Sequence, residues 1–155
     1  MHNLQSISLR EAVLSTKRAK IYTVAIEPFE IKKSEVQKMQ VGDLIELGTQ
    51  RPQIYIYRNG IVVGQAKLGL DENQEAVIIN AKERIVNQGK PKAKYMILEG
   101  RIAILKKGDF VVGKITKLPS GSVENIMLFA NDKLLALAKI LRDKNGYYYR
   151  IEEML

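Results

Sequence analysis

One stretch of this chain comes close to a phosphate-binding loop. GDFVVGKIT, from Gly108 to Thr116, nearly matches the pattern G-x-x-x-x-G-K-[ST], in which backbone N–H groups surround phosphates and the final hydroxyl holds Mg²⁺. Ile115 occupies the position of that hydroxyl, and the bulky run Phe110–Val112 stands where the backbone must approach phosphate. The residues that follow include a proline and have no helical pattern. We therefore predict no nucleotide site here.

The remaining reactive side chains form no catalytic or metal-binding pattern. His2 is the only histidine and cysteine is absent, which excludes thiolate zinc sites, iron–sulfur clusters and disulfides and fits a reducing cytoplasm. A single imidazole cannot make a zinc site or a triad by itself. The carboxylates are scattered over expected turns and surfaces, so no convergent acid–base pair is expected. The sequence predicts no catalytic residue, no metal, no cofactor and no enzyme.

Charge is distributed unevenly along the chain. The formal net charge is +8, but residues 1–80 hold ten basic and nine acidic residues, whereas residues 81–155 hold fifteen and eight. A basic half of this kind can meet nucleic acid, anionic lipid or an acidic protein. Tyr147–Tyr149 follow a basic turn and offer rings for base stacking, although such a run in a last strand more often alternates between core and surface. One of two alternative functions for the chain is therefore that of a small basic β-domain that binds single-stranded nucleic acid.

A β-rich unit occurs twice in the sequence. The stretch RNGIVVGQAKL (58–68) is matched by ANDKLLALAKI (130–140) at an offset of 72 residues. Upstream, Gly42 matches Gly113 at an offset of 71, and Tyr22 matches Tyr95 at an offset of 73. Small drifts of this kind are what loop insertions in a duplicated chain produce. A tandem duplication is the simplest interpretation.

Each copy is predicted to consist mainly of strands. Alternating apolar and polar residues near Phe29 indicate a half-buried strand, in which Pro28 marks an edge or a bend. Asn59-Gly60 between two β-rich runs is the preferred type I′ hairpin turn. SEVQKM (34–39) is expected to form a short helix with Ser34 as its N-cap.

These patterns divide the chain into an N-terminal segment (1–19), a first β unit (20–80), a polar and basic linker (81–93) and a second β unit (94–155). A unit of about 60 residues buries only about 60% of its surface and leaves strand edges exposed. Two copies that face each other remove both problems, so we expect a pseudo-symmetric dimer within one chain. No apolar run approaches the roughly 18 residues that span a bilayer, and the start lacks a signal-peptide pattern.

The order of these features resembles the SpoA (surface presentation of antigens) family. That family includes the FliM/FliN-type proteins of the flagellar motor switch and the cytoplasmic-ring proteins of type III secretion. The likeness rests on VAIEPFEIKKSEVQKMQVGDLIEL in the first copy, on the hairpin RNGIVVGQAKL and on the closing YRI at Tyr149–Ile151. Ile78 takes the place of the closing arginine in the first copy, and Asn131-Asp132 replaces Asn-Gly in the second. The chain is also basic where many family members are acidic or neutral.

The resemblance implies a mostly β fold of two tandem SpoA-like units, each small, barrel-like and strand-swapped, with short helices. It implies a scaffold of a cytoplasmic ring at the inner-membrane base of a flagellum or secretion apparatus, acting in chemotaxis and motility or in export. The implied partners are other ring subunits of the family, further copies of the chain and a helical protein of the export ATPase complex, but not nucleic acid. These partners would hold the chain at the membrane, because no transmembrane segment of its own is expected.

The resemblance also implies a partner-binding patch. Carried over by position, it consists of Leu68, Leu70, Ile140 and Leu141. Alternation along a strand buries about half of its apolar residues, so the same four side chains are equally compatible with a place in the core.

Overall fold

The computed structural model describes residues 22–155 except 71, 73, 74, 87–89 and 106–114. The predicted N-terminal segment (1–19) and most of the phosphate-loop-like stretch lie outside these residues. In the described part, strands dominate, which confirms the predicted mostly β class; they are accompanied by one α-helix, α2 (Lys33–Gln37), and one short 3₁₀ helix, η1 (Ser122–Glu124). No helix in this part is long and apolar enough to cross a membrane.

The strands form one open antiparallel sheet. The first half of the chain contributes β1 (Tyr22–Ile26), β2 (Phe29–Lys32), β3 (Leu44–Gly48), β4 (Gln53–Arg58), β5 (Ile61–Leu70) and β6 (Ala76–Val86). The second half contributes β7 (Tyr95–Leu105), β8 (Thr116–Lys117), β9 (Ile126–Ala130), β10 (Lys133–Asp143) and β11 (Gly146–Met154). Their order across the sheet is β3-β11-β10-β9-β7-β1-β4-β5-β6-β8, and β2 also pairs with β7.

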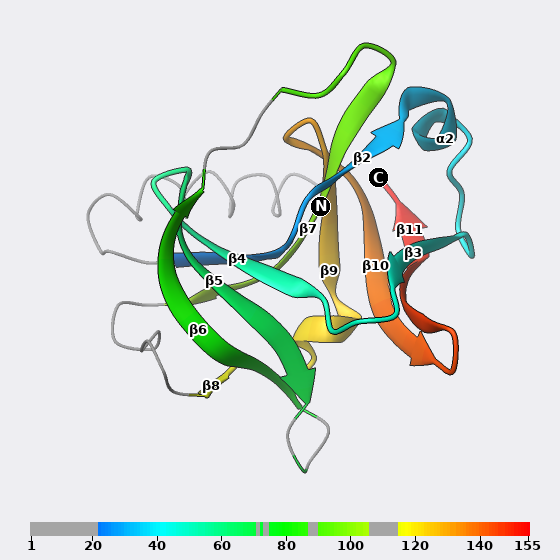
Figure 1. Ribbon diagram of the computed structural model, residues 1–155. Coiled ribbons are helices and arrows are strands. Elements are labelled where there is room, and N and C mark those ends of the chain that lie inside the picture. Colours follow the sequence, from blue (N-terminus) through cyan, green and yellow to red (C-terminus); the bar gives the residue numbers. More distant parts are fainter. Residues whose placement is uncertain (1–21, 71, 73–74, 87–89, 106–114) are drawn as a thin grey trace.

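Two strands lie against the other half of the chain. In Figure 1 the teal β3 runs beside the red β11, and the short yellow β8 lies next to the green β6. Backbone hydrogen bonds extend both pairings: Gly42 N–H donates to the Ile151 carbonyl at 2.8 Å, and Leu118 N–H donates to the Ala76 carbonyl at 2.9 Å. Each half therefore covers an edge of the other with one strand.

The two predicted hairpins have the same kind of turn. Asn59 and Gly60 between β4 and β5 have φ values of 53° and 77°, as the predicted type I′ turn requires at both central residues. Asn131 and Asp132 between β9 and β10 have φ values of 47° and 65°. Asn and Asp tolerate this left-handed conformation better than other residues with a Cβ, so the second turn forms without a glycine.

A single apolar cluster drawn from both halves forms the core. Its most deeply buried side chains include those of Ile54, Ile78, Leu128, Tyr149 and Ile151, all at 0% exposure. Tyr149 lies under Gly100, where an added Cβ would come within 2.8 Å of the Tyr149 ring carbon Cζ. Only glycine leaves room for the tyrosine at this point of β7.

Two local predictions need correction. Strand β6 continues through Val86, into the segment 81–93 that is predicted as a linker, because Lys82 pairs with Gln65 of β5 and Ala81 is buried. Ser34 is not the N-cap of α2: the cap residue is Lys32, which makes no side-chain cap hydrogen bond. The start of the helix is set by β2, since Lys32 is the last residue that pairs with β7.

Candidate functional site

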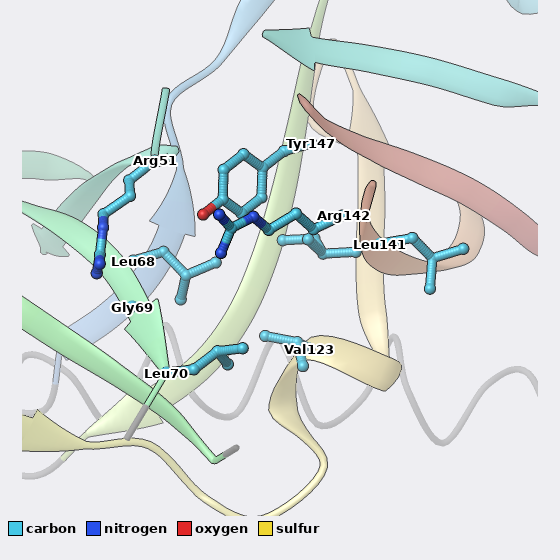
Figure 2. Close-up of a pocket in the computed structure, with 9 residues that line it drawn as sticks. Arg51, Leu68, Gly69, Leu70, Val123, Leu141, Arg142 and Tyr147 are labelled. Atoms are coloured by element: carbon cyan, nitrogen blue, oxygen red, sulfur yellow. The ribbon is translucent and has the colours of Figure 1, made fainter. Parts of the chain in front are cut away.

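A cavity of about 330 Å³ opens where β5 and β10 end. All four residues of the predicted partner patch line it: Leu68, Leu70, Ile140 and Leu141. Val123 of η1 adds a further apolar wall, as Figure 2 shows. We call the site formed by these five residues the apolar groove. The fold thus brings together side chains from two segments that lie 72 positions apart in the sequence.

The predicted residues differ in their access to solvent. Leu68 is 4% exposed and belongs to the core cluster, so it lies at the base of the groove. Ile140 is half-buried and packs against the same cluster. Leu70 is 47% exposed, whereas Leu141 is half-buried and its side chain extends away from Leu68 and Leu70 in Figure 2. A partner would meet Leu70 first, while a change at Leu68 acts on the core.

Most residues that line the cavity are related in pairs by the offset of 72 positions found in the sequence. Four pairs of lining residues stand 72 positions apart: Arg51 and Val123, Leu68 and Ile140, Gly69 and Leu141, and Leu70 and Arg142. Tyr147 of β11 is the remaining lining residue. Residues related by this offset therefore line the same cavity, but they present different side chains.

The polar part of the rim is positively charged. Arg51 and Arg142 line the cavity, and none of the described residues that line it is acidic. Arg142 pairs with Tyr147 across β10 and β11, and its guanidinium carbon lies 5.5 Å from the centre of the Tyr147 ring. This distance is within the range of a cation–π interaction. The site can hold an apolar surface and can accept negative charge beside it.

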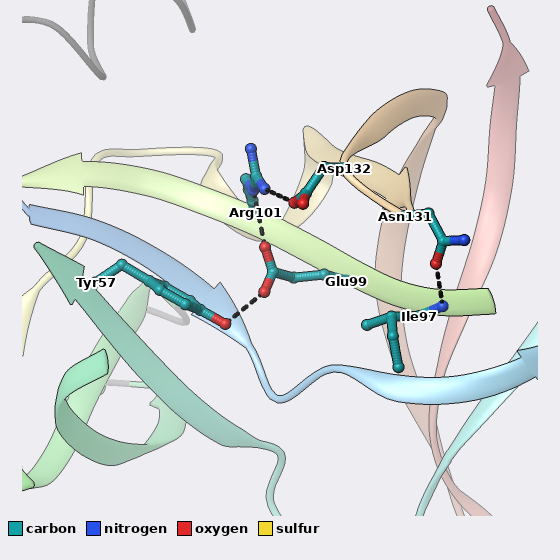
Figure 3. A network of polar contacts seen from close by, with 6 residues as sticks. All are labelled: Tyr57, Ile97, Glu99, Arg101, Asn131 and Asp132. Atoms are coloured by element: carbon teal, nitrogen blue, oxygen red, sulfur yellow. Dashed lines mark hydrogen bonds and ion pairs between the residues drawn. The ribbon is translucent and has the colours of Figure 1, made fainter. Parts of the chain in front are cut away.

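A polar network on β7 links the two halves of the sheet (Figure 3). Tyr57 of β4 donates a hydrogen bond of 2.5 Å to Glu99, and Arg101 pairs with Glu99 at 2.8 Å and with Asp132 at 3.0 Å. The Arg101 guanidinium also lies 3.9 Å over the Phe129 ring. Because the Glu99 carboxylate is paired on both oxygens, it is poorly placed to act as a base, and the network is best described as structural.

This network was not predicted from the sequence. Glu99 and Asp132 count there among scattered carboxylates, since they are separated by more than thirty positions and no local pattern joins them. Asn131 is noted there for its turn, yet its side chain also accepts a hydrogen bond of 2.8 Å from the Ile97 N–H and so ties the turn to β7. Contacts of this kind follow from strand pairing and have no local signature.

A second cavity, of about 430 Å³, is lined mainly by lysines. Its residues are Lys32, Lys33, Ser34, Lys94 and Tyr95. Lys32 pairs with Tyr95 where β2 meets β7, and the Lys33 N–H donates to the Lys94 carbonyl at 2.9 Å. We call these five residues the lysine cavity. It brings together two basic stretches that lie about sixty positions apart in the sequence.

The tyrosine run does not form a stacking surface. Tyr149 is completely buried, while Tyr147 and Tyr148 are half-buried. Burial raises the pKa of Tyr149 well above its usual range, and the negative charge of Glu99 adds to this shift. Its hydroxyl has no hydrogen-bond partner among the described residues. In the run proposed for base stacking, Tyr148 is thus exposed only in part, and Tyr149 belongs to the core.

Comparisons with known proteins leave the family of this chain undecided. Scanned against protein-family models and against curated proteins, the chain matches none of them. Within the described residues, no group of histidine, aspartate and glutamate side chains is arranged to hold a metal ion. The SpoA resemblance therefore remains a prediction.

Proposed function

We propose that this chain consists of two tandem SpoA-like units paired with each other, and that it acts as a scaffold and not as an enzyme. The observation that carries the proposal is the strand order β3-β11-β10-β9-β7-β1-β4-β5-β6-β8. By position in the repeats, the counterparts are β1 and β7, β3 and β8, β4 and β9, β5 and β10, and β6 and β11. Replacing every strand by its counterpart gives the same order, read from the other edge. An order with this property is expected of an isologous, two-fold pair.

A bulge in each hairpin supports the duplication. Ile56 pairs with Gly64 and Tyr57 pairs with Val62, so Val63 is the extra residue in the first hairpin. In the second hairpin the extra residue is Leu135, 72 positions later. Bulges are specific local features, and strands of independent origin have no reason to carry them at equivalent positions.

The register of the exchanged strands supports the strand-swapped arrangement. Ile45 of β3 pairs with Tyr149 of β11, and Thr116 of β8 pairs with Ile78 of β6. The second pair follows from the first by a shift of 71 positions, forward for the one residue and backward for the other, so in this proposal Ile78 is the counterpart of Tyr149 and not, as the offset of 72 predicted, of Arg150. In this proposal each unit lends a strand to its twin and thereby covers an edge that would otherwise be open to aggregation.

The strand pairing bears in two ways on the match between the first strands of the two units. Val24 pairs with Ile56, and Gly100 pairs with Leu128, which is the residue 72 positions after Ile56. By this pairing the counterpart of Val24 is Gly100, at an offset of 76. The pairing of β7 with β1 and β2 also fits the predicted offset of 73, because a shift of 73 positions, forward for the one residue and backward for the other, turns the pair Tyr22 and Leu105 into the pair Tyr95 and Lys32.

As a scaffold of this kind, the chain would belong to a cytoplasmic ring at the inner-membrane base of a flagellum or type III secretion apparatus. Other ring subunits would be its neighbours. The apolar groove is the proposed docking site for an amphipathic helix of a partner in the export ATPase complex. Two features support this use: Leu70 is exposed at the groove, and Ile140 is only half-buried in its wall.

Capture of an amphipathic helical segment from such a partner tests the function. Immobilised wild-type chain should retain the segment at micromolar concentration, and Leu70→Asp should lose it because a carboxylate cannot be buried against an apolar face without cost. Leu44→Asp is the matched control, since Leu44 is 59% exposed and lies outside the groove. Absence of capture by the wild-type chain, or equal loss in both variants, would contradict the proposal.

The proposed pairing of the two units has its own test. A protease site inserted between Gly89 and Lys90 would separate β6 from β7 in the sequence. After cleavage the two fragments should elute together in size-exclusion chromatography and separate only in denaturant, because the core and the exchanged strands hold them. Fragments that separate without denaturant would exclude intimate pairing.

Binding of single-stranded nucleic acid is the second candidate function, and the lysine cavity is the observation that favours it. Phosphate contacts release counterions, so this function predicts an affinity for oligouridine that falls steeply with salt. The burial of Tyr149 weakens this candidate, because a stacking platform needs exposed rings. Negligible oligouridine binding at low salt would remove it.

A further inference from the structure

We infer that the segment which docks in the apolar groove carries acidic residues along the margin of its apolar face. The inference rests on the proposed docking function and adds the charge of the partner to it. It starts from Arg51 and Arg142, the two charged residues that line the cavity. They reach it from different segments, Arg51 from the residues before β4 and Arg142 from the end of β10.

Both arginines are available to a partner. Both side chains are exposed, and neither forms an ion pair with any residue that the structure describes. The described residues around them in the cavity include no acidic side chain. A guanidinium group presents a planar fork of N–H donors that matches the two oxygens of a carboxylate. The rim therefore offers two sites for carboxylates beside an apolar surface.

Each of the two guanidinium groups has a neighbour within the cavity lining. Arg51 lies over Gly69, where an added Cβ would come within 2.9 Å of the Arg51 Nη1 atom. Arg142 lies against the face of Tyr147, as Figure 2 shows. Side chains that are already held in place lose less conformational entropy when a partner binds. Both arginines are thus better suited to recognition than freely moving surface side chains.

The fold itself does not require arginine at either position. The counterpart of Arg51 is Val123, and the counterpart of Arg142 is Leu70, each 72 positions away at the same cavity. An apolar side chain is therefore compatible with both backbone positions. The charge therefore marks the side of the groove at Arg51 and Arg142 and not the equivalent side at Val123 and Leu70. This difference gives a bound segment a preferred orientation.

Synthetic helical peptides of about 18 residues provide the test. Each peptide carries leucines at i, i+3, i+4 and i+7 as one apolar face. Three versions border this face with glutamate, with glutamine or with lysine. Their affinities for the full chain are measured by fluorescence anisotropy at low and high salt, with the folding of every protein variant checked by thermal unfolding.

The glutamate peptide should bind about tenfold more tightly than the glutamine peptide, which corresponds to about 1.4 kcal/mol. This preference should shrink at high salt, because exposed charges are screened. The double variant Arg51→Glu with Arg142→Glu should reverse it in favour of the lysine peptide. Lys32→Glu with Lys94→Glu carries the same change of charge outside the groove and should leave the preference in place.

The outcomes separate this inference from the docking function. If glutamate and glutamine peptides bind equally and Leu70→Asp abolishes both, docking stands and the acidic margin is wrong. If the lysine-cavity control removes the preference as strongly as the arginine variant does, the preference reflects net charge and the inference is again wrong. If no peptide binds at all, the docking function and the inference fall together.

Discussion

The apolar groove and the lysine cavity differ in what holds them in place. The groove is based on core residues such as Leu68, and eight of the nine residues that line its cavity form four pairs separated by 72 positions. The lysine cavity is bordered by exposed lysines, and none of its five residues has a partner at an offset of 72 in the same cavity. A groove built on the core has a defined shape, whereas the exposed lysines mainly provide a positive electrostatic potential.

This difference predicts different kinds of binding. Apolar burial contributes roughly 25 cal/mol per Å² and is insensitive to moderate salt, so a partner in the groove should remain bound as salt is raised. Charge on exposed lysines is screened within about 8 Å at physiological ionic strength. Substitutions that separate stability from binding can test this difference between the two cavities.

The largest effect is expected for Leu68→Asp. Removing a buried leucine costs about 2–5 kcal/mol, and placing a carboxylate in the cavity that remains costs more. Because Leu68 is 4% exposed, urea unfolding should show loss of most of the stability of the chain. Leu70→Asp should change it by less than about 0.5 kcal/mol. Equal stability of the two variants would show that the groove is not built on the core.

A smaller loss is expected for Gly100→Ala, which touches neither cavity. The added methyl group meets the Tyr149 ring and its hydroxyl in the core, and overpacking of this kind costs about 1–3 kcal/mol. Peptide binding to the groove should persist below the unfolding temperature. Gly100→Ala combined with Tyr149→Phe should recover part of the loss, because the hydroxyl is one of the atoms that the methyl group meets. No recovery would locate the strain elsewhere, for example at Ile126.

Alkaline pH should test whether the tyrosine run belongs to the core. The pKa of Tyr149 is raised by burial, so the folded chain favours the neutral phenol. This contribution to stability is complete below the unfolded pKa of about 10 and is lost above it, by about 1.4 kcal/mol per pH unit. Unfolding measured between pH 9 and about 11 should show a shallower decline in Tyr149→Phe. Identical declines would mean that Tyr149 ionises freely in the folded chain.

The smallest effect is expected for Lys32→Glu with Lys94→Glu. Both lysines are exposed, so the stability should change by less than about 0.5 kcal/mol. Capture of an apolar helical segment by the groove should be unchanged, as judged by pull-down at physiological salt. A loss of capture as large as that caused by Leu70→Asp would move the docking site to the lysine cavity and reverse the comparison.

Much of the local structure could be predicted from the sequence. The mostly β class followed from alternating patterns, and the Asn59-Gly60 turn followed from the preference of these residues for positive φ. The four patch residues also converge on one cavity. The start of α2 and the end of β6 were missed, because strand pairing determines where each of them begins or ends. The sequence contains no local signal for such pairing.

Features that depend on neighbouring residues follow from the sequence alone: the strands, the tight turns and the offset of 72 that relates the hairpins. The tertiary structure decided that Leu68 is buried while Leu70 is exposed, that β3 and β8 lie against the opposite halves, and that Glu99 meets Tyr57 and Arg101. The physical reason is range. Backbone conformation responds to residues a few positions away, but burial and ion pairing depend on which distant strands the folded sheet brings together.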